Sequence, residues 1–181
     1  MVSRLARGYV FASAIIGCLV LAIMVILHVR ALLGNTFSVD HAFGLAMLSS
    51  LPLLGLAKDR NIWRNEMRVL PAWVRTVVFA LFVYYFIDFG LILLTGDVTK
   101  SFGASVLSSS FSVMFLGGAL CVPFALLKPR YIAAEELNKR VIRSLGLLAV
   151  GMLIATLSHF DLLPTHHGAE SVLKTASQDV R

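Results

Sequence analysis

Charged residues are scarce in this chain. Aspartate, glutamate, lysine and arginine make up 14% of its 181 residues, whereas soluble domains carry about 25%. Apolar residues reach 58% instead, and the mean hydropathy is +0.84. This composition excludes an ordinary soluble globular domain and predicts an integral membrane protein, whose first partner is the lipid bilayer.

The sequence also lacks the motifs of the common enzyme classes. It contains no P-loop, no glycine-rich dinucleotide fingerprint, no His-Glu-x-x-His zinc motif and no Gly-x-Ser-x-Gly nucleophile elbow. No base accompanies the serines of its fourth apolar run, so an intramembrane hydrolase is a weak alternative. We therefore predict no catalytic residue. The net charge of +6 requires no nucleic acid as a partner, because membrane orientation accounts for the basic residues.

Cysteine is almost absent as well. The two copies, Cys18 and Cys121, both lie inside apolar runs. Cysteines at such positions usually pack as small apolar side chains. We therefore expect neither a disulfide nor a cysteine metal site.

Five apolar runs approach or exceed the length of about 20 residues that a transmembrane helix needs. They predict an all-α fold with five transmembrane helices in one bundle, at about residues 9–33, 37–57, 73–95, 102–127 and 141–160. The second helix is the weakest, because it contains Pro52 and begins at either Phe37 or Ala42. We expect residues 1–161 to form the transmembrane domain and residues 162–181 to form a polar tail outside the membrane.

The basic residues predict the orientation of these helices, because cytoplasmic loops carry the excess of lysine and arginine. Five helices with a cytoplasmic N-terminus put the C-terminus outside. The basic residues on the cytoplasmic side are then Arg4, Arg7, Lys58, Arg60, Arg64, Arg68, Arg75, Lys128, Arg130, Lys139, Arg140 and Arg143. These are twelve of the 16 lysines and arginines. The short loops point to the inner membrane of a bacterium.

Two cytoplasmic segments show helical spacing. Arg60, Arg64 and Arg68 recur every four residues, which suits a short helix over residues 58–70 lying on an anionic leaflet. A basic loop that only obeys the orientation rule is the alternative. In residues 131–143, two glutamates precede a lysine and an arginine by four residues, so the last transmembrane helix is expected to begin in the cytoplasm.

One carboxylate, Asp88, lies inside the apolar run of residues 77–94. A charge at membrane depth is costly, so it normally faces a polar partner or a wet cavity. Counting 1.5 Å per residue puts Asp88 about 10 Å and His28 about 8 Å below the outer ends of their helices. His28 is therefore the favoured partner. A pair of this kind can relay protons or hold a ligand, because imidazole titrates near neutral pH.

Further hydroxyl groups fall at the same depth. Two tyrosines are predicted to share the face of the carboxylate, and four serines of the fourth run recur at i, i+3, i+4 and i+7, which predicts one stripe. The predicted polar site comprises Asp88, His28, Tyr84, Tyr85, Ser105, Ser108, Ser109 and Ser112. The alternative is purely structural hydrogen bonding, in which a hydroxyl group or protonation satisfies the carboxyl group.

The 5 histidines all fall in the outer half of the predicted bundle or beyond it. Imidazole and carboxylate suit zinc or copper, and two imidazoles suit a haem. The weak metal candidates are His28, His41, His159 and Asp161. No His-x-x-x-His or Cys-x-x-Cys spacing supports them, so we predict no cofactor and keep a metal or haem as an alternative.

These features lead to three hypotheses for function. The first is a non-catalytic accessory subunit that packs against other membrane proteins, because soluble domains, catalytic motifs and internal repeats are missing. The second is a small proton-coupled carrier or ligand-binding membrane protein that uses the site around Asp88 and His28. The third is metal or haem binding through the outward histidines.

Overall fold

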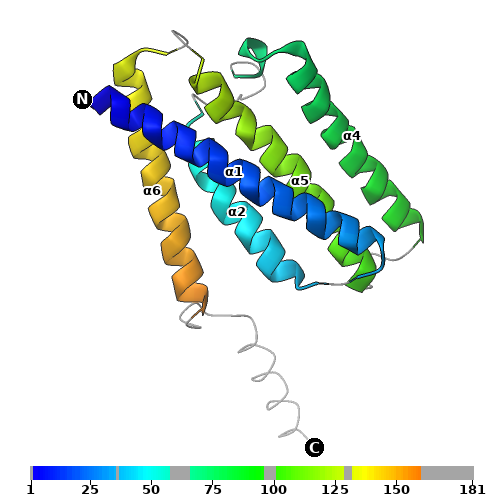
Figure 1. Ribbon diagram of the computed structural model, residues 1–181. Coiled ribbons are helices and arrows are strands. Elements are labelled where there is room, and N and C mark those ends of the chain that lie inside the picture. Colours follow the sequence, from blue (N-terminus) through cyan, green and yellow to red (C-terminus); the bar gives the residue numbers. More distant parts are fainter. Residues whose placement is uncertain (1, 36, 58–65, 96–100, 129–131, 160–181) are drawn as a thin grey trace, which may run out of the picture. The chain divides into compact units, whose positions relative to one another are not determined.

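The computed structural model describes residues 2–35, 37–57, 66–95, 101–128 and 132–159 (Figure 1). In these ranges the fold is all-α. The elements are α1 (Val2–Leu32), α2 (Val39–Gly55), the 3-10 helix η1 (Met67–Val69), α4 (Ala72–Thr95), α5 (Ser101–Leu126) and α6 (Ala134–His159). The chain divides into two compact units, Met1–Leu148 and Ala149–Arg181, and the packed clusters belong to the first.

Four of the described helices are long and apolar enough to cross a membrane, over Arg4–Leu32, Ala72–Thr95, Phe102–Leu126 and Ala134–Leu157. The chain is therefore a multi-pass membrane protein. The remaining helix, α2, has 17 residues. At 1.5 Å per residue it is about 26 Å long, somewhat less than a hydrocarbon core of about 30 Å.

Two helices begin earlier than predicted. α1 begins at Val2 rather than at residue 9, and α6 begins at Ala134 rather than at residue 141. Hydropathy marks only the apolar part of a helix, whereas lysine, arginine and glutamate are good helix formers that prolong it beyond that part. The early start of α6 was expected from its charged pairs. α2 begins at Val39, between its two predicted starts.

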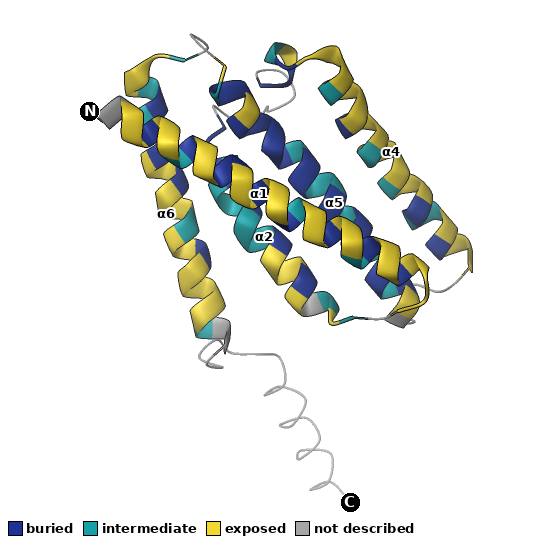
Figure 2. Ribbon diagram, in the orientation of Figure 1, coloured by how far each residue is buried: buried dark blue, intermediate teal, exposed yellow. Residues whose placement is uncertain are grey.

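α5 is the central helix of the first unit. It packs on α1, α2 and α4, and 72% of its span is buried, against 33% for α1 and 17% for α4. Figure 2 shows this contrast as dark blue along α5 and yellow on much of α1 and α4. The exposed side chains on those two helices are largely apolar, as at Phe11, Phe79 and Leu94. Such continuous apolar exposure suits a lipid-facing surface.

Four apolar clusters lie between the described helices, and two of them show how the unit is held together. Met24, Leu53 and Leu116 are fully buried and join α1, α2 and α5. A second cluster includes Val10 of α1 and Leu137 of α6. The first turns of α6 thus belong to the same packed unit as α1.

Polar contacts attach α6 to the end of α2. The last carbonyl groups of a helix have no partner within it. Arg143 Nε donates to Gly55 O at 2.9 Å, and Ser144 Oγ donates to Pro52 O at 2.7 Å. Because the Ser144 hydroxyl proton is used in this way, its oxygen accepts from the hydroxyl of Tyr9 of α1, 2.7 Å away. Three helices therefore meet at Ser144.

Arg140 of α6 lies in a buried ionic cluster and is 5% exposed. Its Nη1 donates to Glu66 Oε1 at 3.2 Å and to Leu56 O at 3.3 Å. Its Nε donates to Glu136 Oε1 at 3.2 Å, which confirms the pairing expected from their spacing. Glu66 is 0% exposed. A buried carboxylate and a buried guanidinium thus hold the segment before η1 against α6.

We expect Gly55→Ala to destabilise this junction. A Cβ at Gly55 would lie 2.5 Å from Ser144 Cα. Because this is a backbone atom, a change of side-chain rotamer cannot relieve the clash. We expect a loss of about 1–3 kcal/mol in the free energy of unfolding. Gly44→Ala in the same helix is the matched control, because a Cβ there meets nothing within 4 Å and Ala favours helix by up to about 1 kcal/mol. Unfolding in detergent, followed by circular dichroism, measures both. Equal stability of the two variants would contradict this close approach.

Candidate functional site

Part of the predicted polar site assembles where α1 and α4 both pack on α5. His28 lies in the last two turns of α1, and Asp88 lies in the second half of α4. Each is only 7% exposed. The helices that carry them are otherwise apolar at this level, so the two residues form a polar spot at membrane depth.

The imidazole of His28 bridges the three helices. Its Nδ1 is 3.0 Å from Ser109 Oγ of α5, and its Nε2 is 2.7 Å from the hydroxyl of Tyr84 of α4. The same Nε2 is 3.7 Å from Asp88 Oδ2, which is too long for a hydrogen bond but within the range of an ion pair. His28, Tyr84, Asp88 and Ser109 therefore form one connected group, which we call the histidine cluster.

The hydrogen-bond partners assign the proton positions in this cluster. Ser109 Oγ donates to Ser105 O at 2.7 Å, so its oxygen accepts from His28 Nδ1–H. In a neutral imidazole Nε2 is then the acceptor, and it receives the O–H of Tyr84. When the imidazole is protonated, Nε2–H donates instead to the Tyr84 oxygen or faces the Asp88 carboxylate. Tyr84 thus connects the two groups that can exchange a proton.

Asp88 is incompletely bonded. Its Oδ2 is buried and accepts no hydrogen bond from any residue in the described ranges. The hydroxyls of Tyr84 and Ser110 lie within hydrogen-bonding reach of the carboxyl group. A buried acceptor without a donor is costly, and the cost falls when the oxygen carries a proton of its own. This environment suits a carboxyl group that changes its protonation state.

Tyr85 does not join the histidine cluster. Its ring lies 6.2 Å from that of Phe89 and 5.6 Å from that of Phe111. Adjacent helical residues are 100° apart, so only one of two neighbouring tyrosines faces Asp88. Ser108 lines the same shallow groove as Tyr85. Tyr85 and Ser108 therefore lie at a different surface from His28.

The other predicted serines lie in helix packing. Ser105 and Ser112 are both 1% exposed. Ser112 Oγ donates to Ser108 O at 2.8 Å, which is the usual way for a helical serine to satisfy its hydroxyl. From the four-serine stripe, Ser109 contacts His28 through its side chain.

Two polar contacts were not predicted from the sequence: one at Asp88, and one outside the histidine cluster. Ser110 lies next to Ser109 but one step around the helix, and it approaches Asp88 from α5. The run of three consecutive serines was a signal, because such a run places a hydroxyl on several faces. The pairing of Glu66 with Arg140 had no signal, since Glu136 already offered the arginine a partner four residues away.

The metal candidates do not form a metal site in the described residues, where no three His, Cys, Asp or Glu side chains gather. His28 and Asp88 are a pair. His41 is exposed in the first turn of α2, with its Nδ1 2.6 Å from Ser38 Oγ. The side chain of His159 and all of Asp161 lie outside the described residues.

The predicted lipid-binding helix falls mostly outside the described ranges, which omit Arg60 and Arg64. Arg68 is exposed and lies in η1, a single 3-10 turn over Met67–Val69. The predicted tail over residues 162–181 also lies outside.

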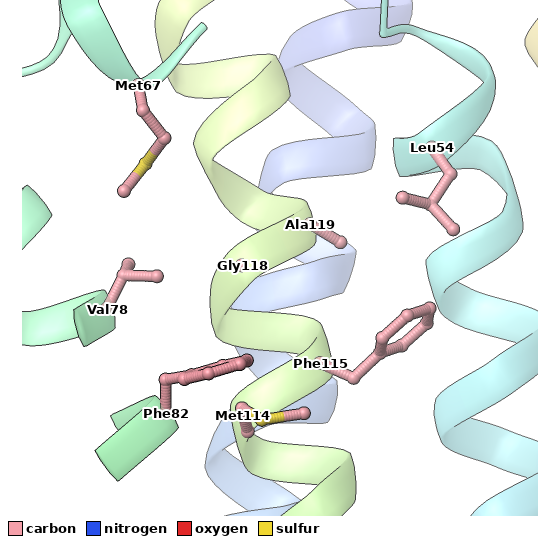
Figure 3. Close-up of a pocket in the computed structure, with 8 residues that line it drawn as sticks. All are labelled: Leu54, Met67, Val78, Phe82, Met114, Phe115, Gly118 and Ala119. Atoms are coloured by element: carbon pink, nitrogen blue, oxygen red, sulfur yellow. The ribbon is translucent and has the colours of Figure 1, made fainter. Parts of the chain in front are cut away.

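A small apolar cavity of about 150 Å³ lies beside α5, between α4 and α2 (Figure 3). Its lining residues are Leu54, Met67, Val78, Phe82, Met114, Phe115, Gly118 and Ala119. In Figure 3, Phe82 of α4 reaches across towards Met114 of α5. The lining is apolar throughout, so this cavity does not extend the polar site.

Comparison with protein-family models, curated proteins and solved structures finds no match to this chain. Its function is therefore argued from the site alone.

Proposed function

We propose that this chain is a small proton-coupled carrier that exchanges a proton within the membrane through the histidine cluster. One observation carries the proposal. A buried imidazole has its Nε2 2.7 Å from the Tyr84 hydroxyl and 3.7 Å from Asp88 Oδ2. Ionisable residues at membrane depth commonly mark proton or ion pathways.

The proposed exchange conserves both protons and charge. A protonated Asp88 gives its proton to the Tyr84 oxygen, while the Tyr84 hydroxyl proton passes to His28 Nε2. The products are a carboxylate and an imidazolium, which attract each other strongly in a medium of low dielectric constant. The reverse transfer restores the neutral pair. Because the net charge of the cluster does not change, the internal step avoids the cost of a lone buried charge.

The proposal includes a topology. We infer five spans in a bacterial inner membrane, with the N-terminus in the cytoplasm and the C-terminus outside. Two observations support it. α1, α2, α4 and α5 alternate in direction (Figure 1), and the proposed orientation would put twelve of the 16 basic residues on the cytoplasmic side, as the distribution of lysine and arginine in membrane proteins requires. This orientation puts the histidine cluster in the outer half of the membrane.

We predict that His28→Leu reduces proton flux at least tenfold. The variant protein is reconstituted in vesicles that contain a trapped pH-sensitive dye, and the flux follows an imposed pH gradient with the membrane potential clamped. Leucine fills similar space but cannot bind a proton. His41→Leu is the matched control, because His41 is exposed and bonded to Ser38 outside the cluster. Unchanged flux in His28→Leu would reject the proposal.

A second proposal is association with other membrane subunits as a non-catalytic accessory protein. It is favoured by Gly8 and Gly44, which are exposed on α1 and α2 and have nothing within 4 Å of their Cβ positions. Small residues on a lipid-facing surface let a partner helix approach closely. Purification of the tagged protein in mild detergent tests this, and a monomer without any bound protein would count against it.

A further inference from the structure

A larger apolar groove lies between α1 and α4, with α5 as its floor. Its volume is about 430 Å³, within the range of about 300–1,000 Å³ that is typical of ligand sites. Its lining includes Leu21 of α1 and Val77 of α4 on the two sides and Leu120 of α5 on the floor. The groove exists because α4 packs chiefly on α5, so a space is left open between the first half of α4 and the middle of α1, at Cys18 and Leu21.

The groove has one charged end. Of the described residues that line it, Lys128 alone is charged. Lys128 follows the C-terminus of α5 and is exposed, and its Nζ donates to Val69 O. An ammonium group has three N–H donors, so two remain for a ligand. Trp73 and Pro71 line the groove near this end of α4, and Trp73 is 70% exposed.

We propose that this groove binds an anionic phospholipid, with one acyl chain lying along its apolar walls and the headgroup phosphate at Lys128. The groove and such a lipid are complementary in both charge and polarity. A cation at one end of an otherwise apolar channel matches a molecule with an anionic head and a hydrocarbon tail. Basic residues close to a membrane surface attract anionic lipid. Tryptophan is enriched at the same headgroup level.

The cavity in Figure 3 differs from this groove in both its volume and its lining. It lies beside α5 between α4 and α2, has a volume of about 150 Å³ and has no charged lining residue. The groove beside α1 is nearly three times larger and ends at a lysine. Lipid binding is therefore assigned to the groove and not to that cavity.

Fluorescence quenching of Trp73 tests the proposal. The chain has 2 tryptophans, so Trp63→Phe leaves Trp73 as the reporter. The protein is reconstituted in phosphatidylcholine bilayers that contain a small, fixed fraction of brominated phosphatidylglycerol or of brominated phosphatidylcholine. A binding site enriches the anionic lipid beside Trp73, so we expect it to quench at least threefold more strongly than the zwitterionic lipid does.

Two variants and one condition make the test specific. Lys128→Gln should remove the preference, whereas Arg75→Gln should keep it, because Arg75 lines a separate depression with Thr76 and Phe79. High salt should weaken the preference in the protein with native Lys128, since ions screen an exposed charge. This last measurement does not depend on the folding of the Lys128→Gln variant. Equal quenching by the two lipids, or a preference that survives both Lys128→Gln and high salt, would overturn the proposal.

Discussion

Replacing Asp88 by asparagine is expected to reduce proton flux to the level of protein-free vesicles. Asparagine has the size of aspartate, and its Nδ2–H can donate to the oxygen of Tyr84, whose own proton binds His28 Nε2, but it does not change its protonation state. The variant should therefore fold. Its unfolding temperature in detergent is expected to equal or exceed that of the native protein, because a buried ionisable group has become neutral.

Two control variants distinguish the loss of the carboxyl group at Asp88 from a change in packing. Asp88→Glu restores a carboxyl group and should recover part of the flux. Glu135→Gln removes a carboxylate from the solvent-exposed pair with Lys139, at side-chain exposures of 82% and 68%, and should leave the flux unchanged. Native flux in Asp88→Asn would show that the histidine cluster serves only structure.

Replacing Arg140 by methionine is expected to destabilise the protein by about 3 kcal/mol, because it removes a cation from beside a fully buried carboxylate. Glu66 is 0% exposed and Arg140 5% exposed. The substitution also leaves Leu56 O without the guanidinium donor. Methionine preserves much of the length of the side chain, so lost packing contributes little. Unfolding in detergent, followed by circular dichroism, gives the change in free energy.

Lys139→Met is the matched control for this prediction. It lies one residue away in the same helix and forms an ion pair of 2.8 Å with Glu135. Both side chains are exposed, so the pair contributes no more than about 0.5 kcal/mol. A similar loss in both variants would mean that burial of the Arg140 cluster adds nothing.

The helices could be predicted closely where apolar runs end abruptly. α4 and α5 begin and end within one residue of the predicted limits. Hydropathy did not predict the starts of α1 and α6, because each continues through charged residues that favour helix as much as apolar ones do, and only the charged pairs of α6 indicated its earlier start. Hydropathy therefore located the membrane part of a helix but not its full length.

The histidine cluster shows where sequence reasoning stops. The depth of His28 and Asp88 follows from the rise per residue alone, and it indicated which cation lies level with the carboxylate. Which face of a helix meets its neighbour depends on packing between side chains distant in sequence. Tyr85 was predicted to share the face of Asp88, but its ring lies against Phe89 and Phe111. Ser110 was not predicted as a site residue, although it follows Ser109 directly.

The contact between Glu66 and Arg140 could not be predicted from the sequence and is seen only in the folded structure. Glu66 and Arg140 are 74 residues apart, and no local pattern relates them. The sequence offered Glu136 as a sufficient partner, and that contact is present as well. Long-range ion pairs of this kind arise from the packing of α6 on the end of α2.

Infrared difference spectroscopy of the reconstituted protein can observe proton exchange at Asp88 itself, because it detects the C=O stretch of a protonated carboxyl group. We expect a band that appears and disappears with pH, is absent in Asp88→Asn and changes its midpoint pH in His28→Leu. We also expect the band to be unchanged in His41→Leu. A band that persists in Asp88→Asn, or whose midpoint is the same in His28→Leu, would contradict proton exchange between His28 and Asp88.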